Sequence, residues 1–215
     1  MIKVLIADDE RLVRTGLRVV LNAEPDLTVV GEAADGTEVA PLAAELRPDV
    51  VLMDVRMPGM DGIRATEHLL GSVQPPPKVL VVTTFENDDY VYEALRAGAS
   101  GFLLKRSRAE EMVQAVRLVA NGDSLLFPAA VRELALHHAE RCTKAPLPLP
   151  RLTDREGEIL RLMAAGLTNG EIAERLVVSP ETVKTHVGSV LAKLRVRDRT
   201  QAVIVAYESG FVRPR

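Results

Sequence analysis

The stretch of this sequence that says most about its fold is Val50-Val51-Leu52-Met53-Asp54-Val55-Arg56-Met57-Pro58-Gly59-Met60-Asp61-Gly62. Four apolar residues lead directly into Asp54, and a Pro-Gly break follows four residues later. A short apolar run bounded by turn signals is typical of a strand that is buried on both faces of a parallel sheet. We therefore expect Asp54 at the carboxyl end of a central strand, which is the edge where open α/β sheets bind their ligands.

Outward from this strand, short apolar runs alternate five times with helical patterns. Strands are expected over residues 2–7, 27–30, 50–53, 78–82 and 101–104, and Gly31 is expected to close the second one. Helices are expected over residues 12–21, 37–46, 62–70, 88–97 and 109–120. This alternation predicts an α/β doubly wound, five-stranded parallel sheet with helices on both faces, in a domain spanning residues 1–121.

Polar side chains gather at the ends of four of these strands. Asp8 and Asp9 follow the first strand, Asp54 ends the third, Thr83 ends the fourth and Lys105 follows the fifth. Clustered carboxylates repel one another unless a cation neutralises them, and Mg²⁺ suits an all-oxygen site. A carboxylate there can attack phosphorus, while a hydroxyl and an ammonium hold the phosphoryl oxygens. Taken singly, Asp8 and Asp9 could cap a helix and Lys105 could be solvated, but the combination favours a phosphoryl site.

The motifs at these strand ends resemble a known family. The matching segments are Ile6-Ala7-Asp8-Asp9, the stretch from Met53 to Gly62, Val82-Thr83-Thr84, and Gly98-Ala99-Ser100-Gly101-Phe102-Leu103-Leu104-Lys105. Over residues 1–121 the chain resembles the flavodoxin-like receiver domain of bacterial two-component response regulators. The resemblance implies that Asp54 accepts a phosphoryl group from a sensor histidine kinase.

The same resemblance implies a role for each neighbouring side chain. Asp9 and Asp54 would ligate Mg²⁺, with Asp8 acting through water and the backbone carbonyl of Arg56 completing the ligands. Thr83 would hydrogen-bond the phosphoryl group, Lys105 would pair with it, and Phe102 would change rotamer as Thr83 moves. Such a change agrees with the physics of phosphorylation, which adds charge and strong acceptors that can reorder a loop.

Two bulky residues near the expected acceptor suggest control of its lifetime. Arg56 lies two residues after Asp54, and Phe85 lies two residues after Thr83. We hypothesise that both side chains flank the path of water to the acyl phosphate and slow its hydrolysis. Substituting either by alanine should then change the rate of dephosphorylation.

Residues 122–151 do not continue the alternation and are expected to form a connector. Pro128 followed by apolar residues predicts one extra helix over residues 129–139. The sequence Pro146-Leu147-Pro148-Leu149-Pro150 is typical of an extended, semi-rigid polyproline spacer. We therefore expect the domain boundary between about residues 141 and 151.

Residues 152–215 predict a small all-α domain. Thr153 with Glu156 and Thr168 with Glu171 have capping-box spacing and mark two helix starts. A third helix follows Ser179-Pro180 and runs over residues 181–194, and a fourth runs over residues 200–208. Two short helices before a polar, basic one are typical of helix-turn-helix DNA recognition, although an ordinary helix bundle has the same pattern. A basic cluster that fits phosphate contacts consists of Lys193, Arg195, Arg197 and Arg199.

This half also resembles a family, the LuxR-type helix-turn-helix domain of the NarL/FixJ regulators. The matching segments are Leu152-Thr153-Asp154-Arg155-Glu156, Gly166-Leu167-Thr168-Asn169, Glu171-Ile172-Ala173, Thr182-Val183-Lys184-Thr185-His186-Val187 and Lys193-Leu194. The resemblance implies that Lys184 and Thr185 face base edges, while Thr182, Ser189 and Lys193 lie toward the DNA backbone. Val203 and Tyr207 on the fourth helix would mediate dimerisation.

Gly188 departs from the family pattern, which usually carries a side chain toward DNA at this position. Glycine inside a helix costs about 1 kcal/mol. It either lets the DNA backbone approach closely or removes one base contact, and the sequence leaves both interpretations open.

Composition limits the other functions that the chain could have. Residues 1–120 carry 13 basic and 19 acidic side chains, and residues 151–215 carry 11 basic and 8 acidic ones, which suggests two domains with different partners. One cysteine, Cys142, excludes an internal disulfide and a cysteine-based metal cluster. No leader and no apolar run of about 18 residues are found, so a cytoplasmic protein without a membrane partner is expected.

The sequence therefore predicts a transcription factor rather than an enzyme. Phosphorylation of Asp54 with Mg²⁺ would switch the second domain to bind double-stranded promoter DNA as a homodimer, with RNA polymerase as a further partner. Two alternatives are a phosphorylation-independent regulator with a vestigial receiver and a Mg²⁺-dependent phosphohydrolase. The complete set of strand-end residues argues against the first, and Arg56, where a general acid would be wanted, argues against the second.

Overall fold

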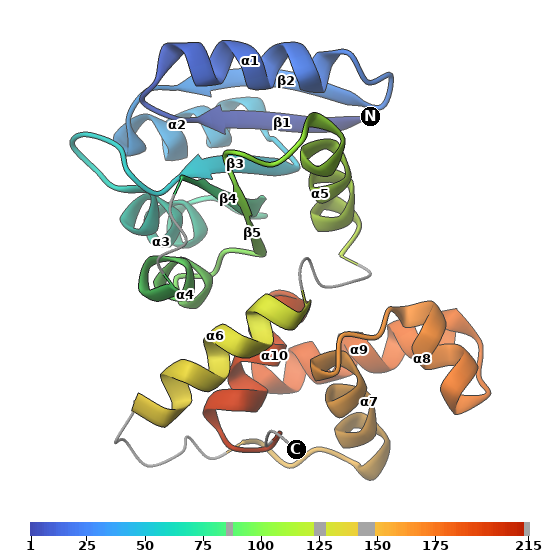
Figure 1. Ribbon diagram of the computed structural model, residues 1–215. Coiled ribbons are helices and arrows are strands. Elements are labelled where there is room, and N and C mark those ends of the chain that lie inside the picture. Colours follow the sequence, from blue (N-terminus) through green and yellow to red (C-terminus); the bar gives the residue numbers. More distant parts are fainter. Residues whose placement is uncertain (85–87, 123–127, 142–148, 213–215) are drawn as a thin grey trace. The chain divides into compact units, whose positions relative to one another are not determined.

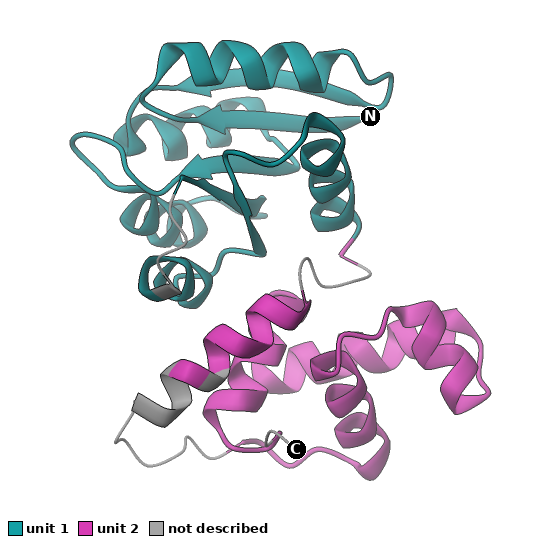
Figure 2. Cartoon of the chain, viewed as in Figure 1, with its two compact units in different colours: residues 1–121 teal, residues 122–215 magenta. Residues whose placement is uncertain are grey.

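The chain folds into two compact units. The computed structural model describes residues 1–84, 88–122, 128–141 and 149–212 (Figure 1). Met1–Asn121 form unit 1 and Gly122–Arg215 form unit 2 (Figure 2). Each unit has its own apolar core and is described separately below.

Unit 1 is built on a five-stranded parallel sheet, which confirms the predicted fold. The strands are β1 (Ile2–Ala7), β2 (Leu27–Ala33), β3 (Val50–Asp54), β4 (Lys78–Thr83) and β5 (Gly101–Leu104). They are ordered β2-β1-β3-β4-β5, and every neighbouring pair is parallel. The central strand β3 is buried along its whole length. A right-handed crossover between parallel strands places helices on both faces of such a sheet.

Five helices cover the two faces of the sheet. They are α1 (Arg11–Asn22), α2 (Gly36–Leu46), α3 (Gly62–Ser72), α4 (Asp88–Arg96) and α5 (Ala109–Asn121). Helix α1 contacts α5 on one face, and α3 contacts both α2 and α4 on the other. The core between these layers is made by fully buried strand residues such as Leu5, Leu52, Leu80 and Leu103.

Strand β2 is longer than the sequence predicted, because Gly31 does not end it. The pairing with β1 shifts register here, since Val4 pairs with Val29 and Leu5 pairs with Gly31. Such a bulge keeps the strand in the sheet beyond a glycine. A Cβ at Gly31 would lie 2.5 Å from the side chain of Leu46 on α2. Glycine at this position therefore provides space for α2 and is not a turn signal.

Helices are the only secondary-structure elements among the described residues of unit 2. Its helices are α6 (Pro128–Arg141), α7 (Asp154–Ala164), α8 (Asn169–Leu176), α9 (Pro180–Leu194) and α10 (Arg199–Glu208). Both predicted capping boxes are present, with Thr153 and Glu156 starting α7 and Thr168 and Glu171 starting α8. Across the described part of the chain, no helix has the length and apolar character needed to cross a membrane.

Helix α6 packs against α10 and so belongs to unit 2 by its contacts. The sequence pattern instead predicts a connector over these residues, with the domain boundary further along the chain. Part of the proposed polyproline spacer, residues 146–148, lies outside the described residues, as does Cys142.

Candidate functional site

The carboxyl ends of β1, β3, β4 and β5 meet at one edge of the sheet in unit 1. The residues at these ends that carry chemistry are Asp8, Asp9, Asp54, Thr83 and Lys105, and we call this set the carboxyl-edge site. Strand pairing alone brings them together, because parallel strands end at the same edge. The backbone amide of Lys105 donates to the carbonyl of Thr83 at 2.7 Å, which joins the last two strand ends.

Lys105 is the centre of this site. Its Nζ lies 2.6 Å from Oδ2 of Asp8 and 2.9 Å from Oδ2 of Asp54, and a third carboxylate, Glu10, is 3.8 Å away. Asp8 and Asp54 are 2% and 5% exposed. Two buried carboxylates, those of Asp8 and Asp54, therefore share one ammonium group.

Burial and charge act in opposite directions on these groups. Burial raises the pKa of Asp54, the hydrogen bond and charge of Lys105 oppose the rise, and the neighbouring Asp8 adds to it. Burial disfavours the charged form of Lys105, but its hydrogen bonds to Asp8 and Asp54 outweigh that effect and raise its pKa. A lysine with a raised pKa stays cationic, so it can neutralise an anion that joins the site.

The donor set fits a hard divalent cation. One carboxylate oxygen from each of Asp8, Asp9 and Glu10 lies within 4.8 Å of the others. Asp9 and Glu10 are exposed, while Asp8 is buried, so the cluster opens toward solvent on one side. Mg²⁺ is held in proteins by one or two carboxylates and keeps several waters, which this half-open arrangement allows.

Arg14 and Gly62, for which the sequence predicts no role in the site, shape it. Nη1 of Arg14 on α1 donates to the carbonyls of Asp8 and Asp9, at 2.6 and 3.1 Å, and fixes the turn after β1. A Cβ at Gly62 would lie 1.9 Å from the carbonyl oxygen of Asp54, so only glycine lets α3 start beside the end of β3. Gly62 is the last residue of the sequence motif, but the need for glycine at this position becomes clear only from the position of α3.

The other predicted residues of unit 1 lie near this edge. Thr83 is buried at the end of β4, and Phe102 is partly exposed on β5, where it pairs with Val81. The backbone amide of Arg56 donates to Asp54, and its guanidinium lies 5.8 Å from the ring centroid of Tyr90 on α4. Phe85, the second residue of the hydrolysis hypothesis, lies outside the described residues.

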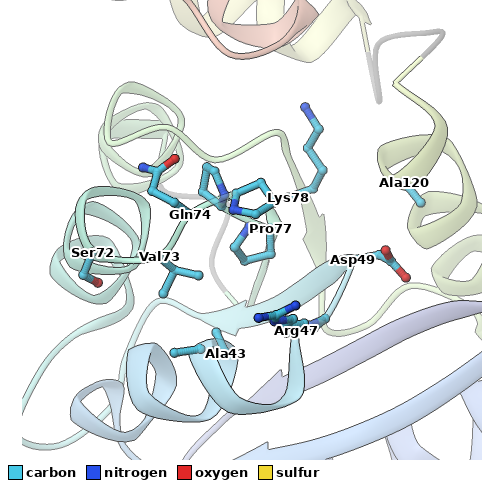
Figure 3. A pocket seen from close by; sticks show the side chains of 13 residues that line it. Ala43, Arg47, Asp49, Ser72, Val73, Gln74, Pro77, Lys78 and Ala120 are labelled. Atoms are coloured by element: carbon cyan, nitrogen blue, oxygen red, sulfur yellow. The ribbon is translucent and has the colours of Figure 1, made fainter.

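A separate pocket of about 460 Å³ lies at the opposite end of the sheet (Figure 3). It is lined by Asp49 and Lys78, where β3 and β4 begin, and by Arg47 and Val73. The charged side chains do not converge on one point (Figure 3). It is therefore distinct from the carboxyl-edge site, and its lining does not form a charged binding site.

In unit 2, α9 presents one apolar and one polar face. Val183, Val187 and Val190 are buried against the other helices. The exposed face carries the predicted DNA-contacting side chains of Thr182, Lys184 and Thr185, and Ser189 is partly exposed. A Cβ added at Gly188 would meet no atom within 4 Å, so none of the residues that the structure describes requires glycine there.

Two basic residues of the predicted DNA-binding surface are already engaged. Nζ of Lys193 donates to Oε2 of Glu156 at 2.6 Å and ties α9 to the capping box of α7. Arg199 is only 3% exposed and donates to the carbonyl of Leu167 and, at 3.0 Å, to Oδ1 of Asn169. The prediction that Arg199 contacts DNA phosphates is therefore wrong, because its guanidinium is a buried clamp between α10 and the start of α8.

The predicted dimerisation residues are buried in this arrangement. Val203 is 0% exposed and Tyr207 is 5% exposed, and the hydroxyl of Tyr207 donates to the carbonyl of Ala164 at 3.1 Å. Neither side chain is available to a second copy while the helices of unit 2 are arranged as they are here.

Comparison with known proteins agrees with this division of the chain. Residues 4–117 match the family model of the response regulator receiver domain, and residues 150–206 match that of the bacterial regulatory proteins of the luxR family. Among solved structures, the response regulator ChrA of a heme-sensing two-component system superposes with a TM-score of 0.51 at 36% identity, covering 98% of both chains. The RcsB response regulator of Salmonella typhimurium gives a TM-score of 0.56 at 27% identity, covering 94% of this chain and 96% of that one.

Similar proteins from two bacteria match this chain over nearly its full length. The transcriptional regulatory protein LiaR of Bacillus subtilis (strain 168) is 46% identical over 212 residues, covering 99% of this chain and all of LiaR. The response regulator protein VraR of Staphylococcus aureus is 42% identical over 211 residues, covering 98% of this chain and 99% of VraR. With a receiver unit that carries a complete carboxyl-edge site and a second unit built for DNA, this chain belongs to the two-component response regulators with a LuxR-type DNA-binding domain.

Proposed function

We propose that phosphorylation of Asp54 switches this transcription regulator into a form that binds promoter DNA as a dimer. The observation that carries the proposal is the ammonium of Lys105, which lies between the carboxylates of Asp8 and Asp54. A phosphoryl group on Asp54 would remove the charge partner that Lys105 has now and offer it a new one with more charge.

The transfer reaction needs little from the protein beyond position and charge. A carboxylate oxygen of Asp54 attacks the phosphorus of a phosphohistidine on the sensor kinase. A P–O bond forms as the P–N bond breaks, and the histidine leaves with the electron pair of that bond. Asp9 and Asp54, with Asp8 through water and the carbonyl of Arg56, would hold Mg²⁺, which neutralises charge on the phosphoryl oxygens.

The switch would travel along the last two strands. Thr83 would donate to a phosphoryl oxygen, and its carbonyl accepts a hydrogen bond from the amide of Lys105. A shift of Thr83 would leave space that the ring of Phe102, on the neighbouring strand, could enter. Such a coupled rotamer change would alter the surface of β5 without unfolding the sheet.

DNA binding would use the exposed face of α9. Lys184 and Thr185 would reach base edges in the major groove, and Thr182, Ser189 and Lys193 would lie toward the phosphates. Lys193 would have to exchange or share Glu156 to do so. Two copies would then place two recognition helices on a pseudo-palindromic promoter site, where RNA polymerase becomes a partner.

The test is DNA binding by the full chain to a selected pool of sites, with and without a small-molecule phosphodonor and Mg²⁺. Wild type should bind at least about tenfold more tightly after treatment, a change of about 1.4 kcal/mol. Asp54→Asn should not respond. Asp49→Asn is the matched control, because Asp49 precedes the same strand at its other end.

The outcomes separate the alternatives. Equal binding in all conditions would indicate a vestigial receiver and would overturn the switch while leaving the DNA-binding unit in place. Continuous release of phosphate from the donor, with no change in DNA binding, would instead favour a Mg²⁺-dependent phosphohydrolase.

A further inference from the structure

Arg14 occupies a place in α1 that the stability of the helix does not favour. The first turn of α1 is Arg11-Leu12-Val13-Arg14, so it carries two arginines. The dipole of a helix makes its N-terminal end positive, and a cation there is unfavourable for the helix itself. Within the part of the chain that the structure describes, Glu10 at the N-cap provides no side-chain cap for α1. What Arg14 contributes therefore lies in its contacts outside the helix.

Those contacts hold both peptide units that flank Asp9. Nη1 of Arg14 donates to the carbonyl of Asp8 at 2.6 Å and to the carbonyl of Asp9 at 3.1 Å. The two carbonyls belong to the peptide units on either side of the Asp9 Cα, and each unit is planar. Because both planes are held, the backbone dihedral angles of Asp9 are restricted, and with them the direction of its Cβ. One guanidinium group therefore restricts where the Asp9 carboxylate points.

The same guanidinium acts on the carboxylate of Asp8 through the backbone. The carbonyl of Asp9 and the amide of Glu10 belong to one peptide unit, and this amide donates to Oδ1 of Asp8 at 2.9 Å. Oδ2 of Asp8 lies 2.6 Å from Nζ of Lys105. Since the peptide unit is planar, a rotation that freed its carbonyl from Arg14 would also turn its amide away from Asp8. The carboxylates of Asp8 and Asp9 are thus both oriented by Arg14.

Arg14 is itself anchored to the neighbouring strand β2. Its Nε lies 3.2 Å from Oε2 of Glu32, and Oε1 of the same carboxylate lies 2.8 Å from Nη1 of Arg18. The side chain of Arg14 is 14% exposed, whereas that of Arg18 is 49% exposed. Within the described residues, Arg14 continues from this carboxylate to the turn after β1, while Arg18 ends at it. The two arginines therefore differ in one respect, which is contact with the turn.

We propose that Arg14 is a positioning residue for Mg²⁺, which presents the carboxylates of Asp8 and Asp9 in the orientation that the cation requires. This role rests on the proposed function in one respect, which is that Mg²⁺ binds at the carboxyl-edge site. Groups that orient metal ligands without touching the metal change its affinity by about 10- to 100-fold. Mg²⁺ is sensitive to such orientation because it demands nearly octahedral geometry.

The charge of Arg14 makes the positioning role distinguishable from two simpler ones. A cation near the ligands repels Mg²⁺, so loss of a positive charge by itself strengthens Mg²⁺ binding. Loss of a positioning group weakens Mg²⁺ binding, although the same charge is removed. A role in stability alone gives a third result, in which the folded protein binds Mg²⁺ as wild type does.

The experiment is an NMR titration of the isotope-labelled full chain with Mg²⁺ alone, in which the amides of residues 8–10 and 54 report binding. Arg14→Ala should raise the Mg²⁺ dissociation constant by about tenfold. Arg18→Ala is the matched control, because it removes an equal charge from the same carboxylate and leaves the turn in place. Its dissociation constant should be unchanged or lower. Asp9→Asn should abolish the response and so identify the site that is measured.

Two further variants keep the test valid if Arg14→Ala does not fold, which the amides outside the site would reveal. Arg14→Lys keeps the charge but lacks the fork that reaches Glu32 and the two carbonyls together. It should bind Mg²⁺ more weakly than wild type, whereas an effect of charge alone would leave binding unchanged. Glu32→Ala releases the anchor of Arg14 and should also weaken binding. Combined with Arg14→Ala it should add little, because the two residues act through one path.

The outcomes separate this role from the proposed function. Mg²⁺ binding by folded Arg14→Ala or Arg14→Lys that equals or exceeds wild type would overturn the positioning role, and the proposed switch would stand. Weaker binding by these variants, in a chain whose DNA binding never responds to phosphodonor, would support the positioning role and refute the switch. A wild-type chain that does not bind Mg²⁺ would refute both the positioning role and the metal site of the proposed function.

Discussion

At the scale of single residues, Lys105 determines how the carboxyl-edge site holds together. Its ammonium is the positive charge that lies 2.6 Å from the Asp8 carboxylate and 2.9 Å from the Asp54 carboxylate. Breaking a buried ion pair by removing one partner is strongly destabilising, because the other charge stays buried without compensation.

We therefore expect Lys105→Gln to destabilise unit 1 by about 3 kcal/mol at neutral pH without Mg²⁺. Added Mg²⁺ should restore part of this loss, since a cation among the carboxylates replaces the missing charge. Urea unfolding of the full chain with and without Mg²⁺ measures both effects. Arg108→Gln, an exposed change beyond β5, is the control. Equal stability of Lys105→Gln and wild type would show that the carboxylates do not repel one another.

Gly188 is the second residue with a specific expectation. Since its Cβ would meet open space, Gly188→Ala should stabilise α9 by about 1 kcal/mol through helix propensity alone. Thermal unfolding measures the gain, and DNA binding decides between the two interpretations of the glycine. Weaker binding would mean that DNA approaches the backbone closely, whereas unchanged or tighter binding would mean that a contact is missing.

At the scale of elements, the end of α8 carries backbone strain. Val177 caps this helix in the left-handed region, with φ of 54°, and is 90% exposed. A β-branched residue is strained in this region, while glycine and asparagine adopt it readily. Val177→Gly should therefore raise the thermal stability of unit 2, by about 1 kcal/mol. A loss of stability would mean that the exposed isopropyl group makes contacts worth more than the strain.

The link between α7 and α9 predicts a dependence on pH. The hydrogen bonds from Lys193 and from the amide of Thr153 lower the pKa of Glu156 from 4.5 to about 2. A carboxyl group with a lowered pKa contributes stability that is fully present above its unfolded pKa and is lost as the pH falls through its folded one. The stability of unit 2 should thus decline between about pH 4.5 and pH 2.

Glu156→Gln should remove this part of the pH dependence and lower the melting temperature of unit 2 at pH 6 more than at pH 3. Melting curves of the full chain over this range measure the effect. Glu158→Gln is the matched control, because Glu158 on the same helix forms a partly exposed pair with Arg155. Parallel curves for wild type and Glu156→Gln would contradict the expectation.

At the scale of the whole molecule, the chain has two cores that share no secondary-structure element. Leu52 lies in the core of unit 1 and Ile159 in that of unit 2, and both are fully buried. Leu52→Ala and Ile159→Ala should each cost about 2–5 kcal/mol and should shift different transitions in calorimetry. Equal shifts of both transitions by either change would mean that the units unfold as one.

The amino-acid sequence was sufficient for the architecture and for which residues meet at the carboxyl-edge site. The alternation of buried runs and helical patterns predicts the parallel sheet, because burial on both faces requires it. Parallel strands then bring Asp8, Asp54 and Lys105 to one edge without any knowledge of packing. The capping boxes at Thr153 and Thr168 are equally local, since their partners are three residues away.

Properties that depend on contacts between distant segments of the chain could be found only from the three-dimensional structure. Arg199 looked like a phosphate ligand in a basic run, but the placement of α8 makes it a buried clamp. The need for glycine at position 62 follows from the close approach of α3 to the carbonyl of Asp54. The assignment of α6 to unit 2 follows from its contact with α10. Local patterns report the conformation of a segment, whereas burial and charge pairing are set by neighbours that the chain brings together on folding.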